Sequence, residues 1–196
     1  LVLVEDAVGQ NFLCEILRRH ARDLLDNCSV VPVGNTDDVY RMVSRFRAEG
    51  VRAVGVRDPD IGDAPADGIF SLPGDVAPET LLLRQENVEA AETFLNGITD
   101  AFEKAKLVGL QLTGSRWAKQ VFPALAQEMQ VPLGMLSDRL TLAWLAKNDG
   151  DANEREHPLR SALGFAGGHQ YGRSQRRKQR RRIAAVFLQT AQVSER

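Results

Sequence analysis

Two aspartates stand one residue apart where a strand-like run ends. Residues 53–57 read AVGVR, and Asp58, Pro59 and Asp60 follow them. The short valine-rich run is typical of a buried strand, and the stretch 58–68, with its glycines and prolines, is typical of a loop. Pro59 fixes its own φ and keeps Asp58 out of helical space. Two carboxylates on a stiffened loop can share a divalent cation, whereas an acidic, solvated turn is the simpler interpretation of these residues alone.

Strand-like and helix-like runs alternate over the first half of the chain. Short β-branched runs predict strands at 1–4, 28–34, 52–57 and 68–73. Apolar residues at helical spacing predict helices at 11–27 and 37–50, with Asn35 or Thr36 as the cap of the second. This alternation predicts an α/β fold, in which a parallel sheet carries helices on both faces.

Such a sheet would bring a second acidic pair to the first one. Glu5 and Asp6 directly follow the first strand, and Asp58 and Asp60 follow the third. Right-handed crossovers place the C-terminal ends of these strands at the same edge of the sheet, which is where open α/β sheets bind ligands. We therefore expect the four carboxylates to converge, and convergence favours a functional site.

The sequence pattern changes after about residue 79. Helical spacing predicts helices at 79–106, 115–129 and 137–151. Trp117 and Trp144 fall in these stretches and are interpreted as core residues. We predict three parts: an α/β domain at 1–85, a mainly helical domain at 86–172, and a basic C-terminal segment with a helix at 173–196.

Charge is distributed unevenly along the chain. The 196 residues have a net charge of −1, but residues 173–196 hold eight basic residues and one acid, which leaves residues 1–172 at −8. A basic segment of this kind can bind DNA phosphates, and a solvated helix face is the alternative. The candidate phosphate contacts are Arg173, Arg176, Arg177, Arg180, Arg181 and Arg182.

Other residue types argue against several classes of protein. The sequence has no run of 18 apolar residues and no secretory signal, so we expect no membrane span and a cytoplasmic location. Cys14 and Cys28 are too few for a zinc site or a disulfide framework. His20, His157 and His169 show no metal-binding spacing. A G-x-S-x-G motif and a Walker loop are also missing, which disfavours serine hydrolase chemistry and ATP hydrolysis.

The placing of the acids resembles a known family. Glu5 after the first strand, and the Asp-x-Asp string at 58–60 after the third, resemble the Toprim fold over about residues 1–85. The continuation LPGDVAPETLLL at 72–83 is similar to the OLD family (overcoming lysogenization defect), in which a further acid joins the site. Here that acid is Glu79. Members of that family carry an ATP-binding-cassette-type ATPase ahead of the Toprim half, which would lie before Leu1.

The resemblance implies a metal-dependent DNA nuclease that hydrolyses phosphodiesters with low sequence specificity, in phage defence or DNA processing. It implies one or two Mg²⁺ or Mn²⁺ ions as cofactors, DNA and the ATPase as partners, and a homodimer as an option. Lys178 is the candidate for the lysine that the family uses to steady the transition state. The implied metal ligands are Glu5, Asp58 and Asp60, with Asp6 and Glu79 as further candidates.

Two other interpretations stay open. OLD-type sequences read Glu, Gly, two variable residues and Asp after the first strand, whereas this chain has Asp6 in the glycine position and Gly9 in place of the acid. The missing acid favours a Toprim scaffold that binds DNA or a partner without cutting. The start of the chain also resembles a receiver domain, in which Asp58 would be phosphorylated with the help of one Mg²⁺. Receivers close their fourth strand with a hydroxyl residue and their fifth with a lysine, which residues 68–76 and the helices after them do not clearly supply.

Overall fold

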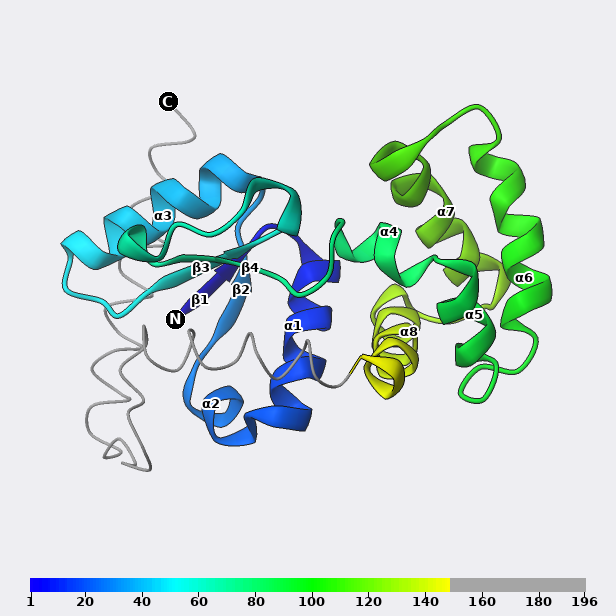
Figure 1. The fold of residues 1–196 in the computed structure, drawn as a ribbon, viewed down its shortest axis with the longest axis horizontal. Coiled ribbons are helices and arrows are strands. Elements are labelled where there is room, and N and C mark those ends of the chain that lie inside the picture. The colour runs from blue at the N-terminus through cyan, green and yellow to red at the C-terminus, as the bar shows by residue number, and fades with distance from the viewer. Residues whose placement is uncertain (149–196) are drawn as a thin grey trace.

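A four-stranded parallel sheet followed by a run of helices forms the described part of the molecule (Figure 1). The computed structural model describes residues 1–148. The strands lie in the order β2-β1-β3-β4 and pair in parallel throughout. They are β1 (Val2–Val4), β2 (Val30–Pro32), β3 (Val54–Arg57) and β4 (Ile69–Ser71). The predicted α/β class and parallel sheet are confirmed.

Period-two alternation along the strands supplies a core on each side of the sheet. Val2 and Val4 of β1 face one core, which they share with α1 (Ala7–His20) and α2 (Arg22–Asn27). Leu3 faces the other core, which is built on α3 (Thr36–Ala48). Figure 1 shows α1 and α3 on opposite sides of the strands. The sheet is therefore covered on both faces, as its nearly all-apolar strands require.

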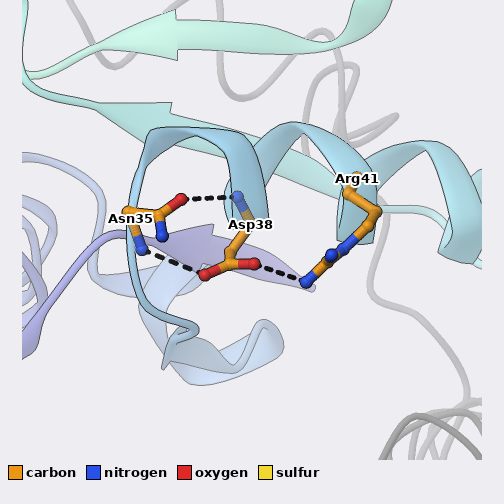
Figure 2. A network of polar contacts seen from close by, with 3 residues as sticks. All are labelled: Asn35, Asp38 and Arg41. Carbon is orange, nitrogen blue, oxygen red and sulfur yellow. Dashed lines mark hydrogen bonds and ion pairs between the residues drawn. The ribbon is translucent and has the colours of Figure 1, made fainter. Parts of the chain in front are cut away.

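The first turn of α3 is held by a reciprocal cap (Figure 2). The Asn35 side chain accepts from the Asp38 backbone N–H at 3.0 Å, and the Asp38 carboxylate accepts from the Asn35 N–H at 3.4 Å. Arg41 adds an ion pair to the same carboxylate at 2.5 Å. Of the two caps that the sequence offered, Asn35 is the one used, and Thr36 becomes the first helical residue.

Five helices follow the sheet and share one of its cores. They are α4 (Pro78–Leu82), α5 (Gln85–Ala91), α6 (Ile98–Ala105), α7 (Gly114–Glu128) and α8 (Leu133–Lys147). Trp144 of α8 is 3% exposed and its ring lies 5.1 Å from that of Phe12 in α1. Trp144 is therefore a core residue, as predicted, whereas Trp117 is partly buried and packs edge-on against Phe102 at the margin of the same core. One apolar core therefore runs from the sheet into α8, across the predicted boundary at residue 85.

Two predicted helices are interrupted in the structure. The helix expected over 11–27 begins already at Ala7 and breaks at Ala21, where the sequence has no glycine or proline. The helix expected over 79–106 is three helices. The chain breaks between α4 and α5 at Arg84, whose backbone is extended, and between α5 and α6 at Gly97, which adopts φ +81° while the Glu92 carboxylate accepts from the backbone N–H groups of Gly97 and Thr99. Side-chain capping of this kind competes with helix continuation, and apolar spacing does not reveal it.

Within residues 1–148, no helix is long and apolar enough to cross a membrane. The rest of the predicted helical domain and the whole basic segment fall outside the described residues. The site and contact predictions that fall there are Lys178, Arg173, Arg176, Arg177, Arg180, Arg181 and Arg182.

Close packing between α3 and β3 leads to a test of the fold. A Cβ added at Gly55 would lie 2.6 Å from Val39 Cγ1 and 2.7 Å from Ile69 Cδ1, so Gly55→Ala should lower the free energy of unfolding by about 1–3 kcal/mol. A Cβ at Gly9, inside α1, would meet only ordinary contacts at 3.5 and 3.6 Å, so Gly9→Ala should raise it by about 0.5–1 kcal/mol. Urea denaturation measures both values, and effects of the same sign would contradict this packing.

Candidate functional site

Glu5 joins three elements at the C-terminal edge of the sheet. It follows β1, and its Oε1 atom accepts from the Thr36 hydroxyl at 2.9 Å and from the Asp58 backbone N–H at 3.2 Å. Thr36 begins α3, and Asp58 follows β3. The pairing of Val4 with Val56 brings these two strand ends together. Glu5 and Asp58 therefore lie side by side although 53 positions separate them in the sequence.

Asp58 is surrounded by other carboxylates. Burial, followed by repulsion from Glu5, Glu79, Asp6 and Asp60, raises the pKa of Asp58 from 3.8 to about 7. Each of these acids was a candidate from the sequence, and all of them act on this one carboxyl. The structure thus gathers the five acids, and no positive group is among the main influences on Asp58. Their roles as metal ligands stay predictions.

A second carboxyl pair, Asp6 with Glu79, adjoins Asp58. Glu79 lies in α4 and is 5% exposed, and burial together with the Asp6 carboxylate raises the pKa of Glu79. The Asp6 carboxylate therefore lies close enough to act on Glu79. Asp6 also caps α1, because its Oδ1 accepts from the Gly9 N–H at 2.8 Å. A bound cation would relieve the repulsion between these two acids.

Sequence reasoning missed two residues at this edge. Thr36 orients Glu5 through its hydroxyl, and Lys119 of α7 offsets part of the rise in the Glu79 pKa. Lys119 belongs to a helix that packs against α4, so the helical stretch brings a positive charge to the acids. Thr36 could have been suspected from its place at the start of the second crossover helix. Lys119 carries no sequence signal, since only tertiary packing brings α7 to this edge.

The donor set suits a hard divalent cation, but the carboxylates are turned toward protein donors. Carboxylate oxygens are the preferred ligands of Mg²⁺ and Mn²⁺, and confined like charges are relieved by a bound cation. Within residues 1–148, no three acidic, histidine or cysteine side chains stand close enough together to hold a metal ion as they are oriented. Binding a cation would thus require the carboxylates of Glu5 or Asp6 to turn away from their present hydrogen bonds.

The cysteines do not compete for this role. Burial raises the pKa of the Cys28 thiol to about 11, and burial likewise raises the pKa of Cys14. Because the thiolate is the nucleophilic and metal-binding form, we expect both thiols to react slowly and to bind metals weakly near neutral pH.

Comparisons of this chain with protein-family models, with curated proteins and with solved structures find no match. The grounds for a functional proposal are therefore the sheet order and the acids gathered at its C-terminal edge.

The raised pKa of Asp58 predicts how stability depends on pH without metal. The native protein holds a proton on Asp58 that the unfolded chain, with a pKa near 3.8, releases. The contribution of Asp58 to the free energy of unfolding therefore falls as the pH rises from about 4 to about 7, and stays low above that. Asp58→Asn should remove this decline and make the metal-free protein more stable than the wild type at pH 8.

Urea denaturation in EDTA at pH 5, 6, 7 and 8 measures this effect. Asp60→Asn is the matched control, because Asp60 is exposed and its charge is better screened. Parallel pH profiles for the wild type and Asp58→Asn would contradict the raised pKa.

Proposed function

We propose that this chain contains the catalytic site of a metal-dependent DNA nuclease of the Toprim type, similar to the nuclease half of OLD-family proteins. The proposed reaction is hydrolysis of phosphodiester bonds with Mg²⁺ or Mn²⁺ and with low sequence specificity. The observation that carries the proposal is that Asp58 is partly buried with four other acids near enough to act on it, and that burial, followed by their repulsion, raises its pKa to about 7. An acidic turn with no ligand would gain nothing from confining so much like charge.

The residues divide into ligands and supporting groups. Glu5 and Asp58 from the two strand ends, with the exposed Asp60, would hold the cation, and Asp6 and Glu79 would hold a second one. When bound, such an ion lowers the pKa of a water molecule and neutralises charge on the scissile phosphate. Thr36 keeps Glu5 directed toward the edge of the sheet.

Among the described residues, Lys119 is our candidate for the lysine that steadies the transition state in the family that this chain resembles. We assign to Lys119 the binding of a phosphate oxygen beside the acids, because α7 packs on the helix that carries Glu79 and the Lys119 charge acts on that residue. Lys178 lies outside the described residues and stays a prediction. A fixed cation there would stabilise charge that develops in the transition state.

One observation favours the receiver-like alternative. Ser71 closes β4 and is 5% exposed, and the sheet order β2-β1-β3-β4 also occurs in doubly wound phosphorylation modules. Against it, within residues 1–148 the chain continues from β4 into helices and forms no fifth strand to carry a lysine. The acid Glu79 also has no part in that chemistry.

Neutralising single acids tests the nuclease. Asp58→Asn, Asp60→Asn and Glu79→Gln keep the side-chain shape and each remove a ligand charge. Nicking of supercoiled plasmid in Mg²⁺ or Mn²⁺ should therefore fall by about 100-fold or more, since a lost metal removes several kcal/mol of transition-state stabilisation. Lys119→Met should lower the rate without raising the Mg²⁺ concentration needed, because it removes a phosphate contact and no ligand.

The controls are EDTA, Ca²⁺ and Asp100→Asn, which removes an exposed acid of α6 far along the chain from the sheet edge. Nicking that survives in Asp58→Asn, or wild-type protein that cuts nothing with any metal, would contradict a nuclease. Labelling of Asp58 by acetyl phosphate without any nicking would establish the receiver-like alternative instead.

Gly9 offers a gain-of-function test of the second cation. A Cβ at this position would lie 3.5 Å from Asp6 Oδ1 in ordinary contact, so a side chain fits and starts beside the carboxyl pair. Gly9→Asp should lower the Mg²⁺ concentration needed for nicking, because it supplies the acid that the family pattern has there. It should also lower stability in EDTA by adding like charge.

Gly9→Ala is the matched control, since it fills the same space without a charge. If the two variants need the same Mg²⁺ concentration for nicking, an acid at position 9 has no part in cation binding. Glu79 and Asp6 would then be the only acids needed for the second cation.

A further inference from the structure

Arg57 is a buried cation that the proposed chemistry does not use. It is the last residue of β3 and is 9% exposed, and it pairs in register with Ser71 of β4. It shares the α3 side of the sheet with Leu3 and Ile69, because residues alternate between faces along a strand. Placing a guanidinium where neighbouring positions are apolar is costly unless the charge makes a specific contact.

The contact that Arg57 makes closes the loop that carries both aspartates. Its Nη2 atom donates to the Gly62 carbonyl at 2.8 Å, so the side chain reaches across residues 58–62 from the strand that precedes them. Gly62 has φ +77° and its N–H donates to the Pro59 carbonyl at 3.3 Å, which folds the arc into a tight turn. A hydrogen bond from a charged donor is worth about twice a neutral one.

The chain on either side of this arc is fixed independently. Asp58 is held by its N–H bond to Glu5, and Asp63 accepts from the Ser71 N–H at 2.6 Å. Ala64 then pairs with Ile69 in a two-bond bridge. The arc from Pro59 to Gly62 lies between these anchors, and Arg57 is the side chain that ties it down.

We infer that Arg57 is a positioning residue, a clamp on the Gly62 carbonyl that holds the loop bearing Asp58 and Asp60 in the geometry needed for cation binding. The inference rests on the proposed function for its metal readout, but the clamp itself is a property of the metal-free protein. Supporting residues of this kind change metal affinity about 10–100-fold when they are lost, because they orient the ligands.

Ser71 supplies a matched control. It lies beside Arg57 in register, is 5% exposed, and has a buried hydroxyl oxygen without a hydrogen-bond partner. Ser71→Ala removes a buried polar group next to the clamp and leaves the bond to Gly62 intact. Arg57→Met removes the donor with similar length, and Arg57→Lys keeps a charge and one donor group.

Two measurements on the full 196-residue chain test the clamp. Amide hydrogen exchange over residues 58–63, in EDTA, should be faster in Arg57→Met than in the wild type and in Ser71→Ala. The Mn²⁺ dissociation constant from electron paramagnetic resonance should rise about 10-fold or more in Arg57→Met, partly recover in Arg57→Lys, and stay unchanged in Ser71→Ala.

The outcomes separate the clamp from the nuclease. If the wild type binds no Mn²⁺, the proposed function fails, and the exchange rates alone decide the clamp. Wild-type exchange rates over residues 58–63 in Arg57→Met would overturn the clamp whatever the nuclease result, as would an unchanged Mn²⁺ dissociation constant. If Arg57→Met does not fold, Arg57→Lys decides: intermediate exchange and affinity support the clamp, and wild-type values overturn it.

Discussion

The pairing of β1 between β2 and β3 is the constraint on which the rest of the structure depends. It sets Val4 beside Val56, and so fixes the ends of two strands that are far apart in the sequence at one edge of the sheet. Glu5 links these strand ends by hydrogen bonds. Its Oε1 atom accepts from the Thr36 hydroxyl at the start of α3 and from the Asp58 N–H just after β3. The two apolar cores hold the arrangement from both faces, with α1 on one side and α3 on the other.

The same constraint confines negative charge. Burial at this edge, followed by repulsion between carboxylates that the sheet holds near one another, raises the pKa of Asp58 and of Glu79. Confining these acids opposes folding at neutral pH, and the apolar cores offset that cost. In the proposed site, a bound cation would restore the lost stability by mass action.

The helical stretch contributes to this edge as well as to the core. Its first helix presents Glu79, and α7 brings Lys119 against that helix. The contact of Trp144 with Phe12 packs α8 against α1, within the apolar core that the helices share with the sheet. Packing that spans most of the described chain therefore brings Glu79 near the acids at the ends of β1 and β3.

Much of the local structure follows from the sequence alone. Alternating runs identified the four strands and the α/β class, and strand-end positions predicted that Glu5 and Asp58 lie at one sheet edge, because buried strands and their exits leave strong apolar and polar patterns. Tertiary structure decided what those patterns do not encode. The break at Ala21, the Glu92 cap that separates α5 from α6, the electrostatic effect of Lys119 on Glu79 and the reach of Arg57 to Gly62 all depend on side-chain geometry. The hydrogen bond from Thr36 to Glu5 likewise joins residues 31 positions apart, so it exists only once the sheet has formed.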